Sequence, residues 1–170
     1  MGAGISWPQS TLDPSQTASL NDSGSLYRIT TFLYTSDAST ANNVPWLVQS
    51  NIGHVISLER RSPRTQMLRY YQANGISFLH YPMADNPSQR VEDVGNAVSE
   101  FFVQNYIQEQ DPKATLIYCH RGESRSPVIA MYVLMHAFGT DFATASAVVR
   151  NSNPMADPKR FFIQQLVGQA

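Results

Sequence analysis

The stretch that determines our prediction of the fold is Ile117 to Pro127, IYCHRGESRSP, which contains the only cysteine of the chain. The apolar run Ala114 to Tyr118 leads into it, and the apolar run Ser126 to Phe138 follows it. A turn that joins a buried strand directly to a buried helix is therefore predicted here. Within this turn, Gly122 lies between the cysteine and Arg125.

The predicted turn suits the binding of a phosphate group. A strand that ends in such a turn and continues as a helix directs backbone N–H groups into one cradle, and the positive end of the helix adds to the field. This field favours the thiolate of Cys119, which is then a nucleophile. Arg125 is expected to fork onto two phosphate oxygens, and Ser126 to donate to the sulfur. An inert core cysteine is the alternative, but it would need neither the glycine nor the arginine.

The same stretch resembles the signature of the cysteine-dependent protein tyrosine phosphatase superfamily, a cysteine and an arginine separated by five residues and followed by serine. The run CHRGESRSPVIAMYVLM is similar to the dual-specificity branch, and four other runs resemble successive elements of that fold: LYRITTFLYTSDAS, NIGHVISL, ISFLHYPMADNPSQ and ASAVVRNSNPMADPKRFFIQQL. The resemblance covers about residues 26 to 167. It implies that Cys119 attacks phosphorus and that the loop binds the phosphate through His120, Arg121, Gly122, Glu123, Ser124 and Arg125.

The resemblance also implies an aspartate general acid on a loop before a long helix. This group protonates the leaving oxygen and later activates water. Asp85, in YPMADNPS, follows a predicted strand and precedes the predicted helix, so we assign it this role. A loop carboxylate without catalytic function is the alternative, and Glu92 and Asp93 are second choices for the acid.

Two residues depart from the family pattern. Tyr118 stands where the family usually has a histidine, so the thiolate loses that support unless the tyrosine forms a hydrogen bond in its place. Glu123 puts a carboxylate on a phosphate loop, where it repels anions unless it points outward or pairs with a cation such as Arg121.

Strand and helix signals alternate along the rest of the chain. Strands are predicted over Leu26 to Tyr34 (one or two), His54 to Leu58, Ile76 to Tyr81 and Ala114 to Tyr118. Helices are predicted after a cap at Asp37 or Ser39, from Ser62-Pro63, from about Pro87 to Gln110, over Ser126 to Phe138, after Asp141 and after Asp157. This alternation predicts an α/β fold with a central, mostly parallel sheet of about five strands flanked by helices, as in the dual-specificity phosphatases.

The length of 170 residues suits one domain, and we expect a flexible arm over residues 1 to 25 and a catalytic domain over residues 26 to 170. A net charge of −1 predicts no general affinity for nucleic acid. With no signal sequence and no apolar run of spanning length, a cytoplasmic or nuclear location is expected. The start of the chain matches the myristoylation pattern, with Gly2 as the acceptor, and a chance match is the alternative. One acyl chain would give only weak membrane contact.

The sequence therefore predicts a protein phosphatase that acts on phosphotyrosine and phosphoserine or phosphothreonine through a phosphocysteine intermediate. No spacing of histidine, aspartate and glutamate suggests a metal centre, and no cofactor is expected. The expected partner is a phosphorylated protein, and the oligomeric state is open. The alternative substrates for the same chemistry are an inositol pyrophosphate, an RNA 5′-phosphate and a phosphoinositide, and Arg121 is the residue that favours them. A domain that binds phosphoproteins without turnover is the other alternative.

Overall fold

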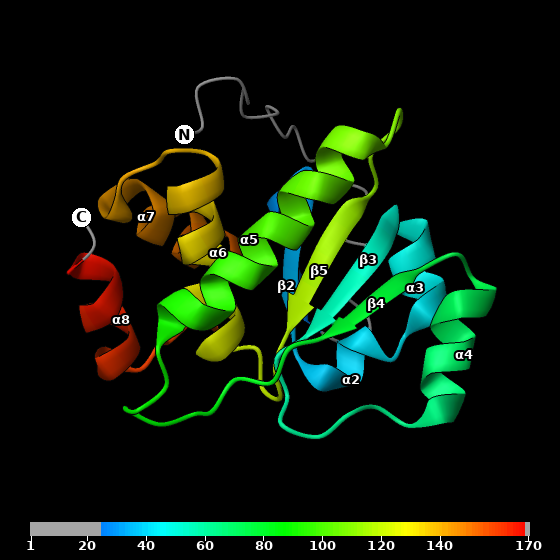
Figure 1. Ribbon diagram of the computed structural model, residues 1–170, viewed down its shortest axis with the longest axis horizontal. Coiled ribbons are helices and arrows are strands. Elements are labelled where there is room, and N and C mark those ends of the chain that lie inside the picture. The colour runs from blue at the N-terminus through cyan, green and yellow to red at the C-terminus, as the bar shows by residue number, and fades with distance from the viewer. Residues whose placement is uncertain (1–24, 169–170) are drawn as a thin grey trace.

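The computed structural model describes residues 25 to 168, which form a five-stranded sheet with helices on both faces (Figure 1). The strands are β1 (Leu26–Thr30), β2 (Leu33–Ser36), β3 (Ile52–Ser57), β4 (Ser77–His80) and β5 (Ala114–Tyr118). Their order is β1-β2-β5-β3-β4, with β1 antiparallel to β2 and the other neighbours parallel. The predicted mostly parallel sheet is confirmed. Gly2 and, apart from Ser25, the predicted arm lie outside the described residues.

Seven helices of the described residues complete the fold: α2 (Ala38–Ala41), α3 (Val44–Gln49), α4 (Thr65–Ala73), α5 (Val91–Gln108), α6 (Arg125–Ala137), α7 (Phe142–Ser152) and α8 (Arg160–Val167). Helices α5 to α8 cover one face of the sheet, and α2 to α4 lie on the other side (Figure 1). None of the helices within residues 25 to 168 is long and apolar enough to cross a membrane.

Strand β5 lies at the centre of the sheet and is buried along its whole length. Because side chains alternate along a strand, its residues supply both apolar cores. Ile117 and Cys119 belong to the core under α5 and α6, whereas Leu116 and Tyr118 belong to the core under α3 and α4. The cysteine therefore points to the α6 side, and the tyrosine before it points to the opposite side.

The predicted helix α6 is confirmed, and nearly all of its residues are buried. The apolar stripe of α5 is also confirmed, with Val91, Val94, Val98 and Phe102 buried. The helix begins at Val91 rather than near Pro87, because the N–H of Val91 donates to Oε1 of Gln165 in α8 at 2.8 Å. The beginning of α5 thus depends on a side chain far along the chain.

Helix capping was predicted correctly in part. Asp37 caps α2 and Asp141 caps α7, each accepting a hydrogen bond from a backbone N–H three residues later. The single short helix predicted after Asp37 is two helices, because Asn43 accepts from the Trp46 N–H and starts α3.

Two further predicted helix starts are wrong. Helix α4 begins at Thr65 after Arg64, not at Ser62-Pro63, and has no side-chain cap. Helix α8 begins at Arg160 after Lys159, so Asp157 does not cap it. The backbone N–H of Asp157 donates instead to the carbonyl oxygen of Glu123 at 2.7 Å. That segment is held against the loop after β5, which delays the helix.

Candidate active site

The loop between β5 and α6 turns its carbonyl groups toward the elements around it. The carbonyl of His120 accepts from the first N–H of α2 at 3.1 Å. The carbonyl of Gly122 accepts from Nδ2 of Asn153, a buried residue after α7, at 3.1 Å. The carbonyl of Glu123 accepts from the N–H of Asp157. Three neighbouring segments therefore hold the outer side of the loop.

The inner side of the loop carries N–H groups. A trans peptide is planar, so the N–H that follows a carbonyl points the opposite way, and the described chain has no cis peptide bond. The N–H groups of Arg121, Glu123 and Ser124 consequently face away from those three segments. Ser124 also leaves the first turn of α6 without a side-chain cap, since its hydroxyl accepts from the Lys159 N–H at 3.0 Å. Backbone N–H groups on the inner side of a turn that leads into a helix suit the binding of an anion.

Gly122 makes this loop conformation possible. Its φ angle is 73°, in the left-handed region that favours glycine. A Cβ at this position would lie 2.9 Å from the Asp37 nitrogen and 2.9 Å from the Ser36 carbonyl carbon. Both are backbone atoms, so they cannot move aside as a flexible side chain would.

Substitution of Gly122 with alanine is expected to reduce both stability and activity. Left-handed strain alone costs about 1 kcal/mol, and the backbone overlap should bring the loss in free energy of unfolding to roughly 3 kcal/mol. Urea denaturation measures this loss. Gly75→Ala is the matched control, because Gly75 has φ 72° but no atom within 4 Å of the position of a Cβ. Equal losses for the two variants would contradict the overlap argument.

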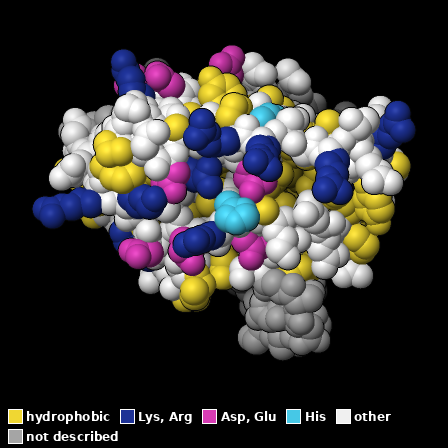
Figure 2. All heavy atoms as spheres, turned by 90° about the horizontal axis from the view of Figure 1, so that it is seen from below, with side chains coloured by type: hydrophobic (Ala, Val, Ile, Leu, Met, Phe, Trp, Pro, Cys, Tyr) yellow, Lys and Arg dark blue, Asp and Glu magenta, His cyan; other side chains and the backbone are white. Residues whose placement is uncertain are grey.

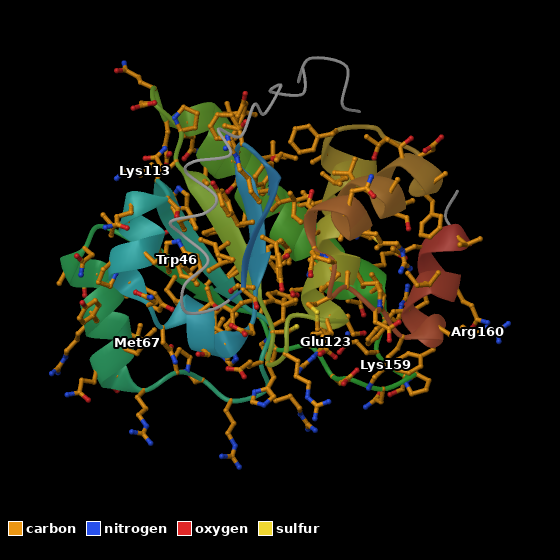
Figure 3. All side chains as sticks on the ribbon, turned by 180° about the vertical axis from the view of Figure 1, so that it is seen from behind. Trp46, Met67, Lys113, Glu123, Lys159 and Arg160 are labelled. Atoms are coloured by element: carbon orange, nitrogen blue, oxygen red, sulfur yellow. The ribbon has the colours of Figure 1, made fainter. Side chains whose placement is uncertain are left out.

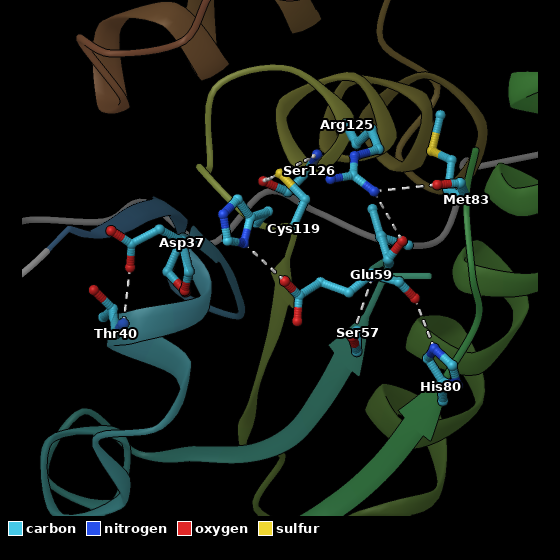
Figure 4. A network of polar contacts seen from close by, with 12 residues as sticks. Asp37, Thr40, Ser57, Glu59, His80, Met83, Cys119, Arg125 and Ser126 are labelled. Carbon is cyan, nitrogen blue, oxygen red and sulfur yellow. Dashed lines mark hydrogen bonds and ion pairs between the residues drawn. The ribbon is translucent and has the colours of Figure 1, made fainter. Parts of the chain in front are cut away.

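The sulfur of Cys119 lies beside Ser126, and both residues are buried (Figure 4). Sγ is 3.3 Å from the hydroxyl oxygen of Ser126 and accepts from the Ser126 N–H at 3.4 Å. Cys119 lines a pocket of about 450 Å³. The other residues that line it are Asp85, His120, Arg121, Glu123, Ser124, Arg125, Asp157 and Lys159.

Arg125 is anchored before any ligand arrives. Its Nη1 donates to the carbonyl of Met83 at 3.2 Å and to the carbonyl of Leu58 at 3.5 Å (Figure 4). These carbonyls belong to the segments that follow β4 and β3. Because a guanidinium has five N–H donors in a rigid plane, anchoring one nitrogen fixes the direction of the others.

The structure brings Asp85 to the same pocket as Cys119. Its Oδ2 forms an ion pair with Nζ of Lys159 at 2.8 Å. The second choices for the acid, Glu92 and Asp93, do not line this pocket; both pair with Arg90 at the start of α5. Asp85 is therefore the only one of the three predicted carboxylates that lies near the cysteine.

Lys159 and Asp157 also line the pocket, a position that the sequence pattern did not predict for either residue. Both lie just before α8, where the sequence pattern suggested only a helix start. Glu123 and Lys159, from different segments, lie at the same end of the molecule (Figure 3). This is the end that Figure 2 faces, where acidic and basic side chains are interspersed. No local signal could have identified Lys159, because its partner Asp85 is distant in the sequence.

Glu123 and Arg121 both line the pocket, but no ion pair joins them in the described part of the chain. The charged lining consists of three carboxylates (Asp85, Glu123 and Asp157) and three permanent cations (Arg121, Arg125 and Lys159), together with His120. The acidic and basic groups therefore nearly balance. No group of three or more histidine, cysteine, aspartate or glutamate side chains within residues 25 to 168 is arranged to hold a metal ion.

Tyr118 lies on the other face of the sheet from Cys119, as the alternation along β5 requires. Burial raises the pKa of the Tyr118 hydroxyl, and a hydrogen bond with Ser57 opposes this shift only in part. The phenol is therefore neutral at physiological pH. It supplies no positive charge to the Cys119 sulfur, whose hydrogen-bond partners are the hydroxyl and the N–H of Ser126.

Known proteins match this chain over nearly all of its described residues. The family model for the dual specificity phosphatase catalytic domain matches residues 33–169. The chain is 27% identical to human dual specificity protein phosphatase 18 over 142 residues, which cover 84% of this chain and 71% of that protein. It is 26% identical to human dual specificity phosphatase 28 over 141 residues, which cover 83% of this chain and 75% of that protein.

Solved structures share the same fold. The crystal structure of human DUSP28 superposes with a TM-score of 0.68 at 26% identity, and the match covers 83% of this chain and 89% of that chain. The matched family model includes every residue of the pocket that contains Cys119.

Proposed function

Because the chain belongs to the dual specificity phosphatase family, a family of cysteine-dependent phosphatases, we propose that it hydrolyses phosphotyrosine and phosphoserine or phosphothreonine in protein substrates. The observation that carries this proposal is the convergence of Cys119, Arg125 and Asp85 on one pocket, beside the inward N–H groups of the loop. A panel of phosphopeptides containing each phosphorylated residue tests it, with release of inorganic phosphate as the measurement.

In the first step, the thiolate of Cys119 attacks phosphorus. The bond between phosphorus and the leaving oxygen breaks, and Asp85 gives that oxygen its proton. Arg125 and the N–H groups of the loop bind the remaining oxygens and stabilise the charge of the transition state. The products are the dephosphorylated side chain and a phosphocysteine.

In the second step, the carboxylate of Asp85 takes a proton from water, and the water oxygen attacks phosphorus. The bond between phosphorus and sulfur breaks, and the sulfur leaves as a thiolate. Ser126, whose hydroxyl oxygen is 3.3 Å from Sγ, donates to the departing sulfur. Lys159 is placed to hold the Asp85 carboxylate during this step.

Substitution of Asp85 with asparagine is expected to lower kcat/KM, which reports the first step alone, for a phosphoserine peptide by about 100-fold, because the serine oxygen needs a proton as it leaves. The loss should be smaller for p-nitrophenyl phosphate, whose leaving group is stable as an anion. Steady-state kinetics on both substrates measures the difference. Asp93→Asn, in a carboxylate outside the pocket, is the control. Equal losses on the two substrates would argue against Asp85 as the acid.

The charges of the pocket support a phosphate monoester rather than a polyphosphate substrate. An inositol pyrophosphate carries many negative charges and requires a surplus of cations, whereas the three carboxylates here offset the three permanent cations. We therefore favour protein substrates. Comparing kcat/KM for phosphopeptides and inositol pyrophosphates tests this choice, and faster turnover of the latter would reverse it.

A further inference from the structure

A second pocket, of about 600 Å³, lies beside the catalytic pocket and takes no part in the proposed reaction. Its walls come from α2, from the segment between β3 and α4, and from α4 itself. Tyr118 forms part of it, and Met67 of α4 lies at the same end of the molecule as Glu123 (Figure 3).

Two side chains in contact, one from each pocket, form a wall between the two pockets. His120 lines the catalytic pocket and Glu59 lines the second pocket, and His120 Nδ1 lies 3.2 Å from Glu59 Oε1. The His120 side chain is 70% exposed, so a ligand can pass over this wall. An extended peptide advances about 3.3 Å per residue, so a few residues span a wall of two side chains whose facing atoms are 3.2 Å apart.

The second pocket has an unbalanced positive charge. Arg61 and Arg64 line it and are exposed, and neither forms an ion pair with any residue between 25 and 168. Glu59 is the only carboxylate among the lining residues, and it already pairs with His120. The two guanidinium groups are therefore free to bind an anionic side chain.

The pocket also offers apolar surface beside these cations. Met67 and Tyr70 are three residues apart on α4, so they share one side of the helix, and both line the pocket. Tyr70 is 48% exposed, a large fraction for an aromatic side chain. Cations next to a thioether and an aromatic ring suit a peptide segment better than a free inorganic anion, because a peptide supplies apolar as well as charged groups.

We propose that the second pocket binds the segment of the substrate protein next to the phosphorylated residue, and that Arg61 and Arg64 select an anionic side chain there. The chemistry recognised is a carboxylate or a second phosphate. This inference deepens the proposed function, on which it rests. It makes the protein selective for phosphorylated sites with an acidic residue within about three positions, the reach of an extended chain across the shared wall.

The test uses matched peptides with one central phosphoserine. Each of the three positions before and after this phosphoserine carries, in turn, glutamine, glutamate or a second phosphoserine. Wild-type protein should show a kcat/KM about five- to tenfold higher for the best anionic peptide than for its glutamine counterpart, the range for one or two exposed ion pairs. Comparing the glutamate and phosphoserine peptides distinguishes the two sources of charge. The preference should shrink as salt increases.

The double variant Arg61→Glu/Arg64→Glu should lose the preference for the anionic peptide, or prefer the glutamine peptide instead. Arg69→Glu makes the same kind of charge change on α4 but does not line the pocket, so it should keep the ratio. A wild-type ratio near one, or equal loss of the ratio with Arg69→Glu, overturns the inference. A change of oligomeric state in the double variant, measured by sedimentation, would also overturn it, because the pocket would then be an interface between copies.

Failure of this inference can be distinguished from failure of the proposed function. Failure to hydrolyse any peptide or p-nitrophenyl phosphate would refute the function. Binding of the same peptides to the Cys119→Ser protein, followed by fluorescence anisotropy, gives the selectivity ratio without turnover. A ratio of five or more there supports the inference, and equal binding of glutamine and glutamate peptides rejects it.

Discussion

Cys119→Ser is expected to abolish the release of phosphate from p-nitrophenyl phosphate, with a fall in kcat of roughly 10³-fold or more. A serine hydroxyl stays protonated at neutral pH and needs a base to become a nucleophile. The neighbouring Ser126 hydroxyl, 3.3 Å from Sγ, is no such base, and His120 Nδ1 is paired with Glu59. The loop N–H groups stabilise an existing anion but do not remove a proton from an alcohol.

Serine is close to cysteine in shape, so the loop should keep its conformation. Thermal unfolding should show a midpoint near that of the wild type, and the variant should still bind phosphopeptides. If the wild-type and serine proteins release phosphate equally slowly while both bind phosphopeptides, the protein is a binding domain without turnover. That result would remove the proposed function and leave the family membership intact.

Arg125→Lys is expected to lower kcat/KM by about 100- to 1,000-fold, the cost of removing a main donor to the transition state. Nη1 of Arg125 is anchored on the carbonyls of Met83 and Leu58, so its remaining donors are directed before substrate binds. A lysine has one ammonium group, which cannot satisfy these carbonyls and also fork onto two phosphate oxygens. Keeping the positive charge should therefore not keep the activity.

The control for this variant is Arg160→Lys, which makes the same exchange at an exposed residue outside the pocket. Product inhibition by inorganic phosphate provides a second measurement, and the inhibition constant should rise in Arg125→Lys alone. Loss of activity without weaker phosphate binding would show that Arg125 does not hold the phosphate group in the ground state.

The central features of the fold could be predicted because they depend on residues close together in the chain. Strand β5, the loop and helix α6 follow one another from Ala114 to Ala137, and each has a local signal: an apolar run, a glycine in a turn, and a second apolar run. The order of Cys119, Arg125 and Ser126 on that loop is equally local. Asp37, with Ser39 as its alternative, and Asp141 were predicted as caps because a cap bonds to a backbone group three residues later.

The tertiary structure decided the features that join distant segments. It placed Lys159 against Asp85 and the N–H of Asp157 against the loop carbonyl, so α8 begins later than its sequence suggests. It also brought Arg61 and Arg64 beside the pocket that contains Cys119. Residues far apart in the chain meet only after the sheet has set their positions, and no local periodicity encodes such a meeting. The sequence alone thus determined the loop after β5 and the order of Cys119, Arg125 and Ser126 on it, whereas folding determined which charges surround them.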